Sequence, residues 1–233
     1  MSNFTLATFN ICSAHFQSGT YTRNNLMALG DCIHRSGADV VCLQEVDRGA
    51  SRSQGVDMSA ELSTRSGLAH HYFIKIRDFQ GGEYGTAILS RYPILESATM
   101  QYPVRIATQG TSCGYVVLDV DGKTVTVFNT HLSVENEASN TETLTCLQNV
   151  LQDYVAAGRG PFLCCGDFNT SPQKVAAYIP WVMQAHDGLT TYADRSIDHV
   201  LYTPPIHVAN ARIMDTQVDR ITDHNMVLVD VTL

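Results

Sequence analysis

The chain has 233 residues, 44% of them hydrophobic, and its 15 Lys and Arg against 23 Asp and Glu give a net charge of −8. This length and hydrophobic content suffice for a sizeable core, so we expect a single domain over residues 1–233. The negative charge opposes the sequence-independent attraction that holds proteins to phosphate backbones, so we expect duplex DNA to be a poor partner. The net charge still leaves room for a local basic groove.

The cysteines and the N-terminal segment bear on the cellular compartment. The seven Cys are odd in number and lack the Cys-x-x-Cys spacing of zinc sites, which favours buried thiols in a reducing environment. The first residues show no basic region followed by an apolar stretch, and no segment approaches the ~20 apolar residues of a membrane span. We therefore expect a cytoplasmic protein without a membrane span. The sequence predicts no oligomeric state.

Strand-like apolar runs recur along the whole chain and alternate with helical patterns. The predicted strands cover residues 4–10, 40–44, 72–76, 86–89, 94–100, 115–120, 124–129, 162–165, 200–202, 208–213 and 226–231. Asp121-Gly122 predicts a hairpin turn between two of them. Helices are predicted over 24–35, 56–65 and 141–156, the last with one apolar face of Leu144, Leu147, Val150, Leu151 and Val155. This mixture indicates either one doubly wound sheet or two packed sheets, with helices outside.

Four short acidic segments lie at ends of these apolar runs. Hydrolysis of a phosphate ester requires neutralised phosphate oxygens, an activated water and a stabilised leaving oxygen, and a hard cation held by carboxylates and amides supplies much of this. A folded sheet would bring the four segments to one edge, which predicts a divalent-metal phosphoesterase site. The segments are Leu43-Gln44-Glu45-Val46, Gly166-Asp167-Phe168-Asn169, Ser196-Ile197-Asp198-His199 and Thr222-Asp223-His224.

Glu45, in the first of these segments, and Asn10, which precedes them in the chain, are predicted metal ligands. Glu45 ends an apolar strand, where a buried anion is costly without a partner such as Mg²⁺ or Mn²⁺. A capping or salt-bridged glutamate is the alternative. Asn10 also follows an apolar strand, and its neutral amide would hold a metal or a phosphate without adding charge, although such an Asn is often a turn residue.

The later segments carry the predicted acid-base groups. Gly166 permits a sharp exit from its strand and leaves Asp167 and Asn169 two residues apart, able to point the same way. An Asx turn before a helix is the alternative. Asp198 and the neighbours Asp223 and His224 complete the set, because one carboxylate can orient the imidazole while another stays available to metal or water.

The order of these motifs resembles the endonuclease/exonuclease/phosphatase superfamily, the metal-dependent phosphoesterases that include deoxyribonuclease I. The resemblance runs over nearly the whole chain and implies a four-layer α/β/β/α sandwich, with the site at one end of two packed sheets. The segments that carry it are Thr8-Phe9-Asn10-Ile11, Leu43-Gln44-Glu45-Val46, Tyr84-Gly85-Thr86-Ala87-Ile88-Leu89-Ser90-Arg91, Asn129-Thr130-His131-Leu132, Gly166-Asp167-Phe168-Asn169, Ile197-Asp198-His199-Val200 and Asp223-His224.

The resemblance implies roles for the residues that handle the metal and the water. Glu45 would be the principal ligand of Mg²⁺ or Mn²⁺, supported by Asn10 and, directly or through water, by Asp223. Asp167 would orient or deprotonate the attacking water. Cys12 stands where several nucleases of the family carry an Asp, and this departure puts a second metal contact in doubt.

The resemblance also implies which residues contact the phosphate. Asn169 would bind it, His131 would donate a further hydrogen bond, and His224, paired with Asp198, would contact the scissile phosphate and its transition state. His199 follows Asp198 where the family often has an aromatic residue, so we interpret it as a packing residue.

The substrate class is less well marked. Only 198 − 169 = 29 positions separate Asn169 from Asp198. Abasic-site endonucleases have a much longer stretch there, which carries loops that grip DNA. Inositol-polyphosphate 5-phosphatases usually have Arg where this chain has Thr170 and His199, and no apolar membrane-docking hairpin of the sphingomyelinase kind is evident.

What remains is similar to small bacterial-type hydrolases, through the segments 47–57 and 81–85. In this interpretation Arg48 and Arg52 would bind a second phosphate of the substrate and Tyr84 would contact the substrate, whereas solvated loop charges are the alternative for the two arginines. Tyr192 and Arg195 would rim the pocket, as would Trp181 unless it is a core residue.

Three functions follow from these residues. The favoured one is an active Mg²⁺- or Mn²⁺-dependent phosphoesterase for a small phosphoester, a nucleotide or a lipid headgroup, attacking by an activated water. A nuclease for single-stranded or structured nucleic acid is the alternative enzyme. A scaffold that binds a phosphorylated partner without turnover is the alternative of another class, but it has no need of a water-activating Asp and an oriented His.

Overall fold

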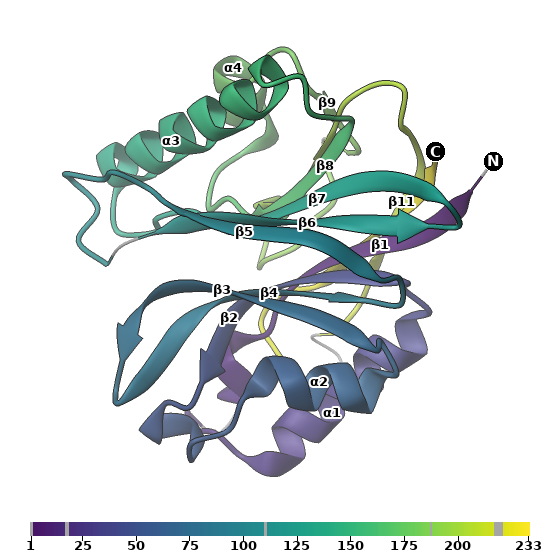
Figure 1. Cartoon of the computed structure of the whole chain (residues 1–233). Helices are drawn as coiled ribbons and strands as arrows, with labels where there is room; N and C mark the ends of the chain where they lie inside the picture. Colours follow the sequence, from purple (N-terminus) through teal and green to yellow (C-terminus); the bar gives the residue numbers. More distant parts are fainter. Residues whose placement is uncertain (1, 17–18, 110, 187, 217–220) are drawn as a thin grey trace.

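The computed structural model describes residues 2–16, 19–109, 111–186, 188–216 and 221–233. Two six-stranded sheets pack face to face, and helices cover the outer face of each (Figure 1). This is the α/β/β/α sandwich that the resemblance implied, and of the two architectures left open by the element pattern it is the one with two packed sheets.

The first sheet has the strand order β11-β12-β1-β2-β4-β3, and helices α1 (Arg23–Ser36) and α2 (Met58–Ser66) cover it (Figure 1). β1 and β2 are parallel, and α1 connects them, as a parallel pair requires a crossover. The strands are β1 (Asn3–Asn10), β2 (Val40–Arg48), β3 (His70–Phe79), β4 (Gly82–Ser90), β11 (His207–Met214) and β12 (Met226–Thr232).

The second sheet has the order β5-β6-β7-β8-β10-β9, and helices α3 (Glu137–Ala156) and α4 (Pro172–Tyr178) cover it (Figure 1). Here β7 and β8 form the parallel pair, with α3 between them. The strands are β5 (Ile94–Gln101), β6 (Ser112–Val120), β7 (Lys123–His131), β8 (Phe162–Asp167), β9 (Met183–Gln184) and β10 (Asp198–Tyr202), and short 3₁₀ helices lie at Cys12–Ala14 and Ser51–Ser53.

The central strands are buried on both faces, which explains why they read as continuous apolar runs. In β1, Leu6 packs into the core between the two sheets, whereas its neighbour Ala7 packs into the core under α1 and α2. Under α3 an aromatic cluster fills the third core, in which the rings of Phe128 and Tyr154 meet edge to face at 4.9 Å. The pleat thus divides each strand's side chains between two cores.

All the predicted strands and helices are present, with ends that differ by a few residues. The Asp121-Gly122 turn is confirmed, because it joins β6 and β7 with both residues at positive φ, 54° and 83°. The apolar face predicted for α3 was wrong at Val155, which is 45% exposed, and Tyr154 is buried against the sheet instead. The two-residue strand β9 and helix α4 were not predicted as elements.

The cysteines are all free thiols, and each is buried or half-buried, as predicted. In the described residues no helix is both long enough and apolar enough to cross a membrane.

Candidate active site

Three predicted site residues lie in one row across neighbouring strands of the second sheet. His131 ends β7, Asp167 ends β8 and Asp198 begins β10, and Asp167 is the register partner of both of the others. Residues that pair directly across strands put their side chains on the same face. Gly166 allows the close approach of β8 to β7, because a Cβ at this position would clash with the carbonyl oxygen of Thr130.

Asp167 is buried at the centre of this row and is held on both of its carboxylate oxygens. Its Oδ1 accepts from the backbone N–H of Asn169 at 2.9 Å, and its Oδ2 accepts from Nδ2 of Asn10 at 3.1 Å. The Nε2 of His131 lies 3.5 Å from Oδ2. Burial raises the pKa of Asp167 and the charge of Asp198 raises it further, while the two neighbouring imidazoles act in the opposite direction.

His224 lies between two carboxylates of the row. Its Nδ1 is 2.9 Å from Oδ2 of Asp198, and its Nε2 is 3.7 Å from Oδ2 of Asp167. Burial opposes a charged imidazole, but the hydrogen bond to Asp198 and the surrounding carboxylates outweigh it and raise the pKa of His224 to about 9. The ring of Tyr192 packs against His224, with centroids 4.7 Å apart. Asp198 therefore fixes the orientation of the imidazole, as predicted from the sequence.

Glu45 enters the site from the first sheet through a β-bulge. The pairing of β2 with β4 shifts between Leu43 and Val46, and Glu45 adopts a φ of 57°. The strand was expected to end near Gln44; instead it continues through the bulge to Arg48. A bulge re-aims a side chain, and here it leaves Glu45 lining the pocket.

A buried amide from the second sheet supports this bulge. Nδ2 of Asn129 donates to the carbonyl oxygens of Leu43 and Ala87, both at 2.9 Å, next to the point where the register shifts. The side-chain oxygen Oδ1 of Asn129 accepts from Nε2 of Gln44 at 2.8 Å. Every polar atom of the Asn129 amide is thus paired, which ties the two sheets together directly under the site.

Asn10 links the groups contributed by the two sheets. Its Nδ2 donates to Oε1 of Glu45 at 3.1 Å as well as to Asp167. Its Oδ1 accepts from the backbone N–H of Cys12 at 3.0 Å. Burial raises the pKa of the Cys12 thiol to about 12, and the charges of Glu45 and Asp223 contribute, so both carboxylates lie near this thiol.

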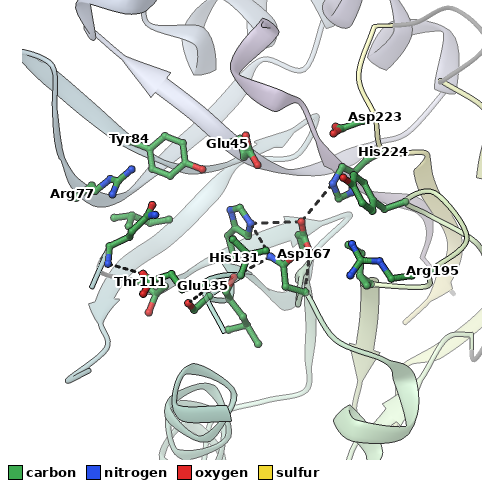
Figure 2. A pocket seen from close by; sticks show the side chains of 18 residues that line it. Glu45, Arg77, Tyr84, Thr111, His131, Glu135, Asp167, Arg195, Asp223 and His224 are labelled. Atoms are coloured by element: carbon green, nitrogen blue, oxygen red, sulfur yellow. Dashed lines mark hydrogen bonds and ion pairs between the residues drawn. The ribbon is translucent and has the colours of Figure 1, made fainter. Parts of the chain in front are cut away.

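The side chains surround one pocket of about 300 Å³ (Figure 2). Asn10 and Asp198 do not line it but contact residues that do. The predicted site residues that line the pocket directly are Glu45, Tyr84, His131, Asp167, Asn169, Asp223 and His224.

Two residues predicted to contact the substrate, Arg48 and Arg52, are held by carboxylates outside the pocket lining, and this part of the prediction needs correction, although Arg52 lies 5.6 Å from the ring centre of the pocket residue Tyr84. Nε of Arg48 donates to Glu83 at 2.6 Å, and Arg52 makes two 2.8 Å hydrogen bonds to Asp47. Asp47 is fully buried, and a buried carboxylate is costly unless it is paired, so it holds the guanidinium of Arg52 in place. Neither arginine lines the pocket.

Other pocket residues were not identified from the sequence. Arg77 and Thr111 line the pocket, and so does Gln109. Arg77 reaches the pocket next to a second register shift, between Lys75 and Arg77 in β3. Figure 2 places Arg77 and Thr111 on the same side of the pocket as Tyr84.

The aromatic and cationic rim is partly as expected. Tyr192 and Arg195 line the pocket, and the guanidinium of Arg195 lies 5.0 Å from the centre of the Tyr192 ring. Trp181 does not line it; its ring packs edge to face against Phe162 at 6.1 Å, in the core under α3.

His199 packs as expected and is separate from the pocket. Its ring meets Phe168 edge to face at 5.3 Å, and its Nε2 lies 2.8 Å from the carbonyl oxygen of Thr170. Burial lowers the pKa of His199 to about 4, so the imidazole is neutral at physiological pH, and its Nε2–H donates a hydrogen bond to this carbonyl oxygen.

Two groups of side chains have the chemistry to hold a metal ion. One ligand atom each from Asp167, Asp198 and His224 lie within 4.8 Å of one another. In that group, however, Nδ1 of His224 is already hydrogen-bonded to Asp198, and both oxygens of Asp167 accept hydrogen bonds. The second group is Glu45 and Asp223 with the amide of Asn10, in which Oε1 of Glu45 and Oδ1 of Asn10 each accept one hydrogen bond. This group offers only oxygen donors, which Mg²⁺ and Mn²⁺ prefer, and no imidazole.

The sequence matches the Endonuclease/Exonuclease/phosphatase family over residues 7–224. The chain belongs to this family. A search of curated protein sequences gave no match.

Solved structures share the fold over the whole chain. An endonuclease/exonuclease/phosphatase from Beutenbergia cavernae DSM 12333 has a TM-score of 0.80 at 23% identity and covers 100% of this chain and 72% of its own. The mannosyl-6-phosphatase Bt3783 of Bacteroides thetaiotaomicron VPI-5482 has a TM-score of 0.77 at 14% identity, covering 99% and 100%. The human Nocturnin catalytic domain with bound sulfate anion has a TM-score of 0.74 at 17% identity, covering 99% and 93%.

Proposed function

We propose that this protein is a phosphoesterase dependent on Mg²⁺ or Mn²⁺, which hydrolyses a phosphodiester or a phosphomonoester by in-line attack of an activated water. One observation carries the proposal. His131, Asp167 and His224 share one pocket with the carboxylate of Glu45, and Asp198, next to Asp167 in the same row, holds His224 by a hydrogen bond. A binding scaffold needs the positive charge of a metal or an arginine, but it has no use for an imidazole fixed by a buried carboxylate.

Glu45, Asp223 and Asn10 would hold the metal. The fit rests on the donors that are present, because the carboxylates of Glu45 and Asp223 line the same pocket and the amide of Asn10 contacts Glu45. When bound, the ion supplies positive charge to the phosphate oxygens and lowers the pKa of water. Cys12 adds a thiol where a further oxygen ligand would otherwise stand.

The remaining residues handle the water and the phosphate. Asp167 accepts the proton of the attacking water, since its carboxylate lies in the pocket and is held in a fixed direction by Asn10 and the Asn169 N–H. His224 presents Nε2 to the pocket while Nδ1 is bound to Asp198, so it donates a hydrogen bond to a phosphate oxygen as charge develops. His131 provides a second donor from the neighbouring strand.

The pocket favours a small ester. Its volume of about 300 Å³ is at the lower end of the usual range for ligand pockets, ~300–1,000 Å³, and the protein carries a net charge of −8. Both features support a sugar phosphate, a nucleotide or a lipid headgroup over duplex DNA. The name of the Bacteroides neighbour, a mannosyl-6-phosphatase, supports a phosphomonoester as one candidate.

The test is hydrolysis of a panel containing p-nitrophenyl phosphate, bis-p-nitrophenyl phosphate, sugar phosphates, nucleotides, phospholipids and single-stranded nucleic acid. Activity on at least one small ester should vanish with EDTA and return with Mg²⁺ or Mn²⁺, because the proposed ligands are oxygen donors. Zinc-only rescue or full activity in metal-free buffer would contradict the proposal. Binding of phosphoesters without turnover under any metal would identify a scaffold, and turnover of nucleic acid alone would identify a nuclease.

A further inference from the structure

Arg77 is one of the arginines, with Arg105 and Arg195, that make no ion pair with a carboxylate in the described residues. In the described residues it makes neither an ion pair nor a hydrogen bond, and its Nε is buried without a partner. Such isolation is notable in a chain with an excess of acidic residues. Seven other arginines each pair with a carboxylate: Arg23, Arg48, Arg52, Arg65, Arg91, Arg159 and Arg212.

Two aromatic rings position the Arg77 guanidinium instead. It lies 5.0 Å from the ring centre of Phe79 and 5.2 Å from that of Tyr84, and Tyr84 is also its register partner on β4. Aromatic faces attract a cation without neutralising it. The positive charge of Arg77 is therefore held in one place and stays available to an anion in the pocket.

The opposite wall of this part of the pocket provides a second unused donor. Thr111 is 6% exposed, and its Oγ1 is buried without a hydrogen-bond partner. The acidic residue of this wall, Glu135, lies near enough for its charge to interact with that of Arg77, but its carboxylate is held by the backbone N–H groups of Thr108 and Gln109 at 2.9 to 3.1 Å. An unpaired cation and an unpaired hydroxyl thus line the same cavity.

We propose that Arg77 and Thr111 form a subsite for a second phosphate of the substrate, distinct from the phosphate at Asp167 and His224. The inference rests on the proposed function, since it adds a specificity to that site. Figure 2 shows Arg77 on the side of Tyr84 and Arg195 on the side of His224, with Asp167 between them. A molecule with two phosphates would therefore meet a cation at both ends of the pocket. The planar guanidinium fork matches phosphate oxygens in two-point hydrogen bonding.

The experiment compares ligands that differ only in the second phosphate. Hydroxyalkyl monophosphates and alkane-1,n-bisphosphates of the same chain length are assayed as substrates with Mg²⁺, and their binding is measured by calorimetry. The proteins are the parent, Arg77→Ala and the control Arg105→Ala. Arg105→Ala removes one positive charge, as Arg77→Ala does, but Arg105 is exposed and does not line the pocket.

The parent should prefer the bisphosphate of the best length, in binding and in kcat/KM. Arg77→Ala should weaken binding of the bisphosphate, and lower kcat/KM for it, by about 10- to 100-fold, the effect of losing a charge-assisted hydrogen bond. Binding of the monophosphate and kcat/KM for it should stay near the parental values. Arg105→Ala should leave the affinity and kcat/KM for both ligands unchanged. Thr111→Val should give a smaller loss in the same direction.

Two results would overturn the subsite. A parent that binds both ligand classes equally at every chain length has no second phosphate site. If Arg77→Ala weakens the binding of both ligand classes to the same extent, the substitution has disturbed the pocket as a whole and not a second phosphate site. Calorimetry separates these outcomes from failure of the proposed function, because a protein without any turnover would still show bisphosphate-selective binding if the subsite exists.

Discussion

The two sheets deliver their functional side chains in different ways. In the second sheet, His131, Asp167 and Asp198 line up through regular pairing of three adjacent strands. In the first sheet, Glu45 and Arg77 lie at register shifts on the two strands that flank β4. The row of His131, Asp167 and Asp198 thus stands on regular strand pairing. Glu45, which we assign to the metal, and Arg77, which we assign to the second phosphate, stand at bulges.

This difference shows two ways in which a sandwich can bring acidic and basic side chains together at one end of its sheets. Regular register fixes the spacing of neighbouring carboxylates and imidazoles, which suits groups that exchange protons. A bulge turns one side chain out of the alternation, and here it leaves a charged residue lining the pocket. The side-chain amide of Asn129, from the second sheet, donates hydrogen bonds to the carbonyl oxygens of Leu43 and Ala87 beside the bulge at Glu45 and so links the two sheets there.

The largest effect is expected from the centre of the regular row. Asp167→Asn should lower kcat by ~10²–10⁴-fold, the usual contribution of an acid-base group, because the amide cannot accept the proton of the attacking water. Steady-state hydrolysis of the best ester measures this. The matched control is Asp153→Asn, an exposed residue of α3, which should keep the parental kcat. Equal rates for the parent and Asp167→Asn would remove Asp167 from the chemistry.

A smaller effect is expected from the end of the row. Asp198→Asn keeps the shape of the side chain but removes the charge that orients His224 through Nδ1. We expect kcat to fall by roughly 10–100-fold, as for other groups that orient a functional His, while KM changes little. A fall in thermal stability with unchanged kcat would show that Asp198 is only structural.

Much of this arrangement could be predicted from the sequence, because the regular part follows from simple patterns. Apolar runs that end in Asp167 or begin after Asp198 place these residues at the ends of strands, and the predicted pairing of His224 with Asp198 is present as a hydrogen bond. The fold itself was implied by the order of the motifs. These positions could be predicted because local pattern and tertiary position agree there.

The bulges themselves could not be predicted, because register is a property of two strands together, although Glu45 was identified as a site residue from its place at the end of an apolar run. Nothing near Arg77 in the sequence distinguishes it from a solvated charge, and its position depends on pairing with Tyr84. Arg48 and Arg52 were predicted to contact the substrate from their place after Glu45, yet Glu83 and the buried Asp47 hold them away from the pocket.

The central claim is that the first sheet binds the metal and the second sheet activates the water. Mn²⁺ titration by calorimetry of the parent, Glu45→Gln and Asp167→Asn tests it most directly, with kcat measured on the same samples. Glu45→Gln should weaken Mn²⁺ binding at least ~10-fold, and excess Mn²⁺ should restore part of its turnover. Asp167→Asn should bind Mn²⁺ like the parent and remain slow at saturating metal. Loss of Mn²⁺ affinity in Asp167→Asn with parental affinity in Glu45→Gln would contradict the account and place the metal at Asp167, Asp198 and His224.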